Sequence, residues 1–236
     1  MIDGVDQLWG ILQLSDSAFP TGSFAYSWGM ETLVQEEVIR NSDQARKWLT
    51  HTLEFSWGPG DGRVTAMVWG AAQECAMKRV AEIDAWLTAS RSSDELRRGA
   101  LQTGRRLLTE ASRLVNDPKV SDYRDTCMQE SEILGNPAVV MGLLGSTLKW
   151  SVTNTVLAAG FQAANALVLA LVKLVPLGQG EGQSLLRAAG IVVERLVQEV
   201  CDESSSEDMA QIAQVVPWLD IAGMRHEKLY TRLFRS

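Results

Sequence analysis

The sequence contains few of the residues from which catalytic and metal centres are built. It has two histidines, His51 and His226, and three cysteines that lie far apart. Two histidines are too few for a metal-binding cluster of their own, and no Cys-x-x-Cys pair is present. The sequence also lacks a glycine-rich loop followed by Lys-Ser/Thr and a Gly-x-Ser-x-Gly turn. These absences argue against a P-loop nucleotide site and a serine-hydrolase nucleophile.

One segment matches half of a zinc motif. His226-Glu-x-x-Tyr230 has the spacing of His-Glu-x-x-His, but a tyrosine stands where the second histidine is needed. Because two imidazoles at i and i+4 hold zinc from one helix face, and tyrosine is a poor substitute, we expect an ordinary helical turn here. The sequence therefore predicts no metal site, no cofactor and no enzymatic activity.

Excess positive charge and an export signal are missing as well. The formal net charge is −7, which argues against nucleic acid as a partner, since nucleic acid selects basic surfaces. The odd number of cysteines suits no disulfide framework and indicates a reducing compartment, which we take to be the cytoplasm. The opening residues MIDGVDQLWG are acidic where a signal peptide is basic, so we expect no export.

Residues 151–172 carry no charge and are numerous enough to cross a bilayer. The same stretch holds six polar side chains, which are costly in lipid. We therefore expect the central helix of a soluble bundle, and no membrane as a partner. The polar residues are Ser151, Thr153, Asn154, Thr155, Gln162 and Asn165.

Hydrophobic residues make up 46% of the chain, and their spacing is helical throughout, without strand-like alternation. The sequence predicts a single all-α domain over residues 1–236. In this bundle the apolar helix at 153–175 is surrounded by amphipathic helices. The expected helices span about 43–56, 63–77, 80–89, 93–115, 137–150, 153–175, 186–200, 209–215 and 218–224.

Helix boundaries follow from capping and breaking residues. Ser42 is expected to cap the first of these helices, which should end at Pro59, Gly60 and Gly62. Ser93 and Pro137 suit the starts of two later helices. The expected connections include a glycine-rich turn at 176–183 and an acidic, serine-rich loop at 202–208.

The segment from Gln13 to Glu31 places several aromatic residues around one turn. Phe19 precedes Pro20 and is therefore extended, while Gly22 permits a turn or a close backbone approach. These aromatics can simply fasten an ordered loop to the core. Alternatively the segment contributes to a docking surface, for which the candidate residues are Ser23, Tyr26, Ser27 and Glu31.

The C-terminal tail, residues 225–236, is basic within an acidic protein. It contains tyrosine and arginine, the residue types that most often anchor protein interfaces. Its apolar residues Leu229, Leu233 and Phe234 can equally cover the core. We favour a tail that becomes ordered against a partner. The candidate contact residues are Arg225, Tyr230, Arg232 and Phe234, and we expect residues 1–31 and 225–236 to act as partner-binding extensions.

Four segments in order resemble the UreF family of urease accessory proteins. The first segment, Leu14–Glu31, resembles the family's opening Pro-x-Gly-Gly/Ser-Phe-x-x-Ser-x-Gly-Leu/Met-Glu signature. The second, Asn136-Pro-Ala-Val-Val-Met-Gly142, has asparagine where the family commonly has histidine, which puts in doubt any role for an imidazole at that position. The others are the Leu-x-Pro-Leu-Gly-Gln turn within 173–183 and the closing Arg225-His-Glu-x-x-Tyr230-x-Arg-Leu-Phe234. The opening signature is carried by Pro20, Gly22, Ser23, Phe24, Ser27, Gly29, Met30 and Glu31.

The resemblance implies a helical protein, often a homodimer, that helps to assemble the nickel centre of urease. It implies that the chain binds a UreD-type (also called UreH-type) accessory protein. It further implies that the pair recruits the UreG-type GTPase to the urease apoprotein. GTP hydrolysis and nickel carriage would belong to the GTPase, while this chain positions it and regulates the timing of hydrolysis.

Two alternatives remain open at this point. The chain could carry nickel itself, which His226 and the three cysteines would have to support. A hydrolase with an unrecognised carboxylate pair is supported only by the abundance of Asp and Glu, most of which are expected on solvent faces.

Overall fold

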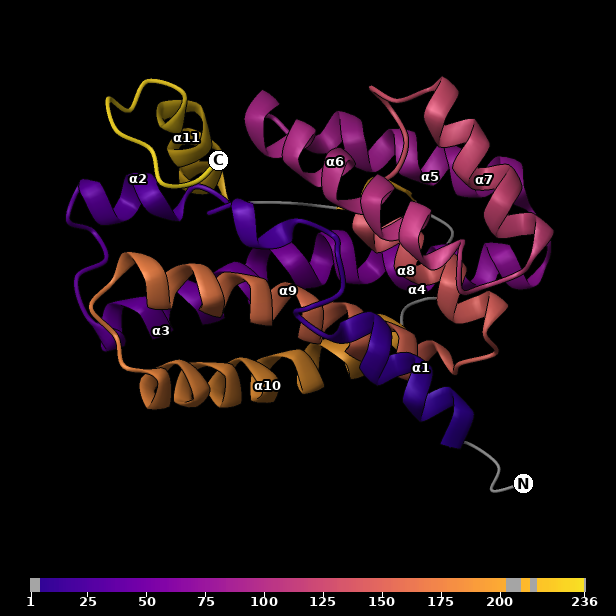
Figure 1. The fold of residues 1–236 in the computed structure, drawn as a ribbon, viewed down its shortest axis with the longest axis horizontal. Coiled ribbons are helices and arrows are strands. Elements are labelled where there is room, and N and C mark those ends of the chain that lie inside the picture. Colours follow the sequence, from indigo (N-terminus) through magenta and orange to yellow (C-terminus); the bar gives the residue numbers. More distant parts are fainter. Residues whose placement is uncertain (1–4, 203–208, 213–215, 236) are drawn as a thin grey trace.

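The computed structural model describes residues 5–202, 209–212 and 216–235. Within these ranges every regular element is helical, so the all-α prediction is confirmed (Figure 1). The α-helices are α1 Val5–Ser15, α2 Met30–Gln35, α3 Ser42–Thr52, α4 Arg63–Gln73, α5 Met77–Ser90, α6 Asp94–Ala111, α7 Pro118–Gln129, α8 Pro137–Thr147, α9 Val152–Leu174, α10 Gln179–Asp202 and α11 Pro217–His226. Two short 3₁₀ turns cover Ser23–Ala25 and Met209–Gln211, and a π-helix covers Leu53–Gly62.

Helices α8 and α9 form the centre of the packing. α8 is apolar nearly all round and is buried along most of its length, against α4, α6 and α9. α9 packs chiefly on α10 and also contacts α8 and α4. α9 is long and apolar enough to span a membrane, but 56% of its most apolar stretch is buried inside the protein. The expected central helix is thus present, with Leu157 and Phe161 on its exposed face.

Close helix packing depends on glycine at two positions. A Cβ atom at Gly142 of α8 would lie 2.6 Å from the carbonyl oxygen of Thr65 in α4. A Cβ atom at Gly104 of α6 would lie 2.6 Å from the backbone nitrogen of Pro137. Both distances are far inside van der Waals contact with backbone atoms, so α8 can approach α4 and α6 this closely only where no side chain intervenes.

The predicted break at Pro59 is wrong. Residues 53–62 continue the helix as a π-helix, with Pro59 inside it, and α4 follows without interruption. The nearby glycines permit close packing instead of ending the helix, since a Cβ at Gly58 would lie 2.7 Å from Leu196 Cδ2. The local pattern predicts a turn at these glycines because it holds no information about the opposing helix.

Helix α3, the first of the predicted helices, is capped one residue earlier than expected. Asn41, not Ser42, is the N-cap of α3, and its side chain accepts a hydrogen bond of 3.0 Å from Gln44 N. We expect Asn41→Ala to lower the free energy of unfolding by about 1 kcal/mol, because a helix N–H loses its acceptor. Ser42→Ala should change it much less. Equal losses in urea unfolding of the two variants would contradict this assignment.

Other boundaries agree or shift modestly. Ser93 caps α6, Pro137 is the first residue of α8, and α11 covers the helix expected at 218–224. α10 begins at Gln179, so the glycine-rich connection is shorter than expected. The backbone N–H of Gly178 donates to Glu181 Oε2 at 2.8 Å.

Helices α1, α2 and α7 were not predicted. The loop at 202–208 lies almost entirely outside the described residues, as do residues 213–215 of the short helix expected at 209–215.

Candidate partner-binding surface

The N-terminal segment and the C-terminal tail meet in one surface. The backbone N–H of Arg235 donates to the carbonyl oxygen of Ala25 at 2.8 Å, and the Gln35 amide donates to the carbonyl of Thr231 at 3.1 Å. Figure 1 shows α2 beside α11, with the C-terminus against the segment that precedes α2. We call residues 23–36 together with residues 225–235 the composite surface.

A buried polar cluster fastens the two parts together. His226, at the end of α11, has no exposed surface, and its Nε2 lies 2.9 Å from Glu31 Oε2. Its Nδ1 lies 3.1 Å from both carboxylate oxygens of Glu95 on α6. Because both ring nitrogens are occupied, the imidazole has no nitrogen left for a metal ion. Among the described residues no group of three or more His, Cys, Asp and Glu side chains is arranged to hold a metal.

Glu31 is the point at which the tail is held. Its exposed fraction is only 1%, and its Oε1 and Oε2 accept hydrogen bonds from the backbone N–H groups of Leu233 at 2.7 Å and Phe234 at 3.1 Å. Gly29, with φ of +81°, starts α2 against the backbone of Gly223 and brings Glu31 to this position. A carboxylate that accepts backbone N–H groups fixes the path of the chain that donates them.

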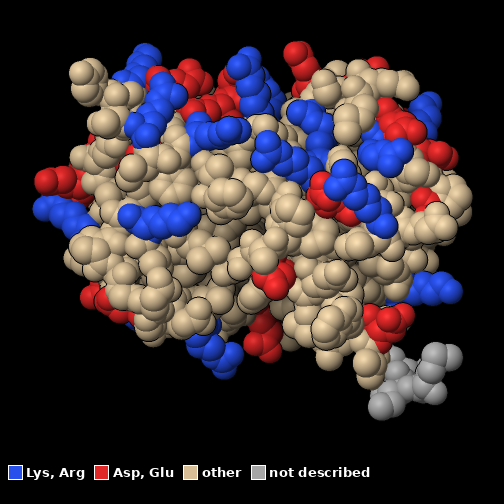
Figure 2. All heavy atoms as spheres, in the orientation of Figure 1, with Lys and Arg blue, Asp and Glu red and all other residues tan. Residues whose placement is uncertain are grey.

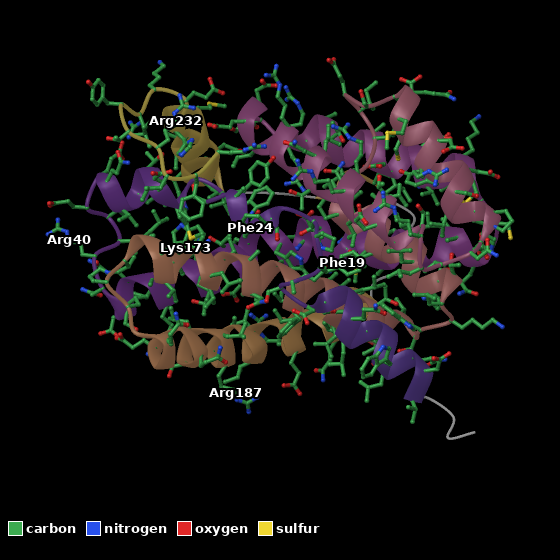
Figure 3. All side chains as sticks on the ribbon, in the orientation of Figure 1. Phe19, Phe24, Arg40, Lys173, Arg187 and Arg232 are labelled. Carbon is green, nitrogen blue, oxygen red and sulfur yellow. The ribbon has the colours of Figure 1, made fainter. Side chains whose placement is uncertain are left out.

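The outer side of the composite surface is apolar and cationic. Phe24 is 61% exposed and Leu233 is 80% exposed, and the Tyr230 side chain is fully in solvent. Lys173, at the end of α9, places Nζ 5.8 Å from the centre of the Phe24 ring and 5.7 Å from that of Phe234 (Figure 3). Lys173 therefore connects the exposed Phe24 of the N-terminal segment to the buried Phe234 of the tail.

Charged side chains of both signs surround the composite surface. Figure 2 shows Lys and Arg over the upper part of the molecule, where α6 and the tail lie, interspersed with Asp and Glu. Arg98 on α6, Arg113 just after α6 and Arg225 in the tail are largely exposed, and they pair with Asp94, Glu110 and Glu36. Arginines at such positions can form directional bonds to a partner's carboxylates.

The predicted contact residues fall into two groups. Arg225, Tyr230 and Arg232 are at the surface; Arg225 pairs with Glu36 at 3.1 Å, and Arg232 Nη1 lies 3.7 Å from Glu95 Oε1. Tyr26, Glu31 and Phe234 are buried. The Tyr26 hydroxyl donates to Gln102, and Ser23 is half-buried beside Thr21. Their roles in partner contact stay predictions, and the buried three can act only by shaping the surface.

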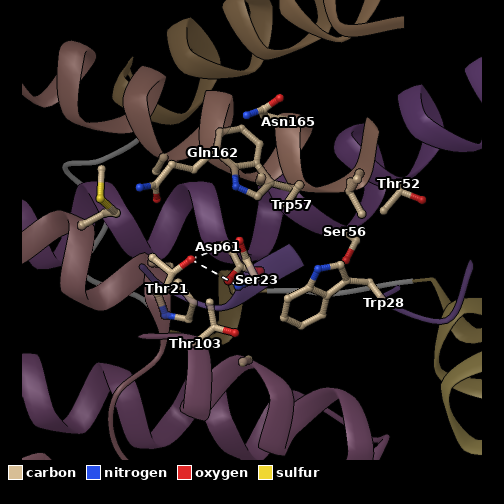
Figure 4. Close-up of a pocket in the computed structure, with 18 of the residues that line it drawn as sticks. Thr21, Ser23, Trp28, Thr52, Ser56, Trp57, Asp61, Thr103, Gln162 and Asn165 are labelled. Carbon is tan, nitrogen blue, oxygen red and sulfur yellow. Dashed lines mark hydrogen bonds between the residues drawn. The ribbon is translucent and has the colours of Figure 1, made fainter. Parts of the chain in front are cut away.

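A cavity of about 210 Å³ lies beneath the N-terminal segment (Figure 4). Three hydroxyls that line it, on Ser15, Thr52 and Thr103, are buried and have no hydrogen-bond partner among the residues that the structure describes. The segment over this cavity is held both by a polar contact, from the Gln162 amide to the carbonyl of Leu14, and by the buried side chains of Leu14, Tyr26 and Met30.

A second buried network, which the sequence did not reveal, supports the start of α8. Asp84 on α5 accepts hydrogen bonds from the Tyr123 hydroxyl at 2.5 Å, Gly135 N at 2.6 Å and the side-chain amide of Asn136 at 2.6 Å. Burial raises the pKa of Asp84, and these donors oppose the rise. Burial likewise raises the pKa of the neighbouring Cys127 thiol to about 12, so this thiol is unreactive. Asn136, at the position where the resemblance suggests histidine, thus serves as a structural anchor.

The described residues form an all-α protein in which the N-terminal segment and the C-terminal tail meet in the composite surface. Residues 39–190 match the UreF family. The chain is 32% identical to the urease accessory protein UreF of Kocuria rhizophila, with 97% of each chain covered. It is 31% identical to that of a Nostoc species over 96% of this chain and 94% of the relative. It is 29% identical to that of Streptococcus salivarius over 96% and 93%.

The chain belongs to the UreF family of urease accessory proteins. This membership implies a role in urease maturation and agrees with the resemblance found in the four sequence segments. The family model matches residues 39–190, so the composite surface lies outside that match, whereas the alignment with the Kocuria relative covers 97% of this chain.

Proposed function

We propose that this protein is a scaffold for urease maturation in the cytoplasm. Together with a UreD/UreH-type protein, it recruits a UreG-type GTPase to the urease apoprotein and regulates that GTPase during nickel insertion. The observation that supports the proposal is the composite surface, in which two chain ends are fixed to each other and still leave Phe24, Tyr230 and Leu233 exposed. Homodimer formation, which the resemblance implies, belongs to the same proposal.

The contact to the UreD/UreH-type protein is assigned to the composite surface. Aromatic and aliphatic side chains that protrude from a rigid backbone are effective anchors, because little conformational entropy is lost when they bind. The surrounding arginines add orientation, since a guanidinium can form paired, directional bonds to a carboxylate.

We expect the double substitution Tyr230→Ala and Leu233→Ala to abolish co-elution with the UreD/UreH-type protein, with at least about a hundredfold loss of affinity. Both side chains are exposed, so the melting temperature should stay within about 2 °C. Co-expression followed by size-exclusion chromatography measures binding, and thermal unfolding of the chain alone measures stability.

Ile191→Ala is the matched control, because Ile191 is an exposed aliphatic residue on α10, outside the composite surface. It should leave co-elution unchanged. Retention of full binding by the Tyr230/Leu233 double variant would reject the assignment of this surface. Separate elution of the unsubstituted chain from every accessory protein would reject the scaffold itself.

A further inference from the structure

His226 lies between the carboxylates of Glu31 and Glu95, and a neutral imidazole cannot donate a hydrogen bond to both of them. A neutral imidazole has one N–H, yet each ring nitrogen faces a carboxylate at hydrogen-bond distance. Both contacts are hydrogen bonds only when the ring is protonated on both nitrogens or when a carboxyl group carries the extra proton. The Glu31–His226–Glu95 cluster is therefore complete only in a protonated form.

The position of the tail depends on the same atoms. Glu31 Oε2 is bonded to the His226 ring and to the N–H of Phe234, and Glu31 Oε1 is bonded to the N–H of Leu233. One carboxylate thus connects α2 to the end of α11 and to the last residues of the tail. A change in its orientation changes the hydrogen bonds of both tail residues at once.

The surrounding charges make loss of this proton costly for the docked tail. Glu31 faces the ring from α2 and Glu95 faces it from α6, both with low exposure. Arg232 of the tail is a cation beside this cluster, with its Nη1 3.7 Å from Glu95 Oε1. On α11 itself, Arg225 is paired with Glu36 at the surface, and Asp220 is hydrogen-bonded to Ser92 and Ser93. After deprotonation, a ring lone pair points at one of two buried carboxylates, which is repulsive.

We propose that the Glu31–His226–Glu95 cluster is a proton-dependent latch that holds the C-terminal tail on the body of the protein. With the proton present, the tail is docked and the composite surface is formed. Loss of the proton releases residues 227–235, which become free to adopt another path. Glu31 and His226 are positioning residues that shape the surface without touching the partner. Only the consequence for partner binding rests on the proposed scaffold function.

Hydrogen exchange of the isolated full-length chain tests the latch. The observables are the backbone N–H groups of Leu233, Phe234 and Arg235, each of which has an acceptor in the docked tail. Exchange is followed from about pH 5.5 to about pH 8.5 and corrected for the intrinsic pH dependence of amide exchange. We expect the protection of these amides to fall by about tenfold or more across this range, while core amides of α8 keep theirs.

Two variants separate the latch from general stability. His226→Gln removes the imidazole and with it the shared proton of the cluster, so the protection of the tail should become independent of pH. Glu95→Gln offers an amide N–H to Nδ1 of a neutral ring, so the tail should stay protected at the highest pH. The latch is rejected if protection in the unsubstituted chain does not depend on pH. It is also rejected if both variants show the unsubstituted pH dependence. Neither result concerns partner binding, which the co-elution experiment tests separately.

Discussion

Adding a single methyl group at Gly104 should destabilise the protein by about 3 kcal/mol. Gly104 lies on α6 where the Gly135–Pro137 backbone crosses it. A Cβ would lie 2.6 Å from Pro137 N and 2.7 Å from the carbonyl carbon of Asn136. Backbone atoms cannot rotate away as a side chain can, so the loop or the helix must move. Either movement also strains the hydrogen bonds of Asp84, which hold Gly135 and Asn136.

Urea unfolding of Gly104→Ala followed by circular dichroism measures this effect. Gly190→Ala is the control, because Gly190 is an exposed helical glycine on α10 and a Cβ added there would meet no atom within 4 Å. The control should gain about 0.5–1 kcal/mol, since alanine restricts the unfolded chain and favours helix. If Gly104→Ala is as stable as the unsubstituted protein, the close crossing of α6 by the loop is wrong.

The second large effect is expected at Asp84. Asp84→Asn should lower the free energy of unfolding by about 2–4 kcal/mol, because two of the four buried donor contacts lose their acceptor oxygen and face the new amide N–H donors instead. Tyr123→Phe removes one of these contacts and should cost about 1 kcal/mol. Equal losses in the two variants would contradict the central position of the carboxylate.

The Asp84 contribution should also depend on pH. Burial raises its pKa, so the native state binds this proton more tightly than the unfolded chain does. The associated stabilisation is therefore complete below the ordinary carboxyl pKa and is lost as the pH rises through the native value. The stability advantage of the unsubstituted protein over Asp84→Asn should decrease as the pH rises above the ordinary carboxyl pKa. An advantage that increases over this range would show that the donors outweigh burial.

Local signals in the sequence were sufficient for much of the fold. Two helix starts were predicted from residues within a single turn. α6 begins after Ser93, which precedes Asp94 and Glu95, and α8 begins at Pro137. The uncharged stretch at 151–172 was also sufficient to predict α9. The π-helix was missed because its glycines are explained by residues such as Leu196, which lies far away in the sequence.

The candidate site was only partly predictable for the same reason. The aromatic and arginine content singles out each end of the chain separately, but nothing local shows that the two ends touch. Glu31 and His226 are 195 residues apart, and Asp84 and Asn136 are 52 residues apart. From the sequence alone, a buried carboxylate in a helix cannot be distinguished from a solvent-exposed one, because the segment that covers it is not known. The sequence therefore predicts a surface contact at Glu31 and gives no sign of the network at Asp84.

The meeting of the two ends has a consequence for biosynthesis. Glu31 emerges early from the ribosome, whereas the backbone groups that it binds belong to Leu233 and Phe234 and emerge about two hundred residues later. A polypeptide interrupted before residue 233 therefore lacks these contacts, however well its central helices have folded. Under the proposed function, such an interrupted translation product would not form the composite surface and would not enter the assembly.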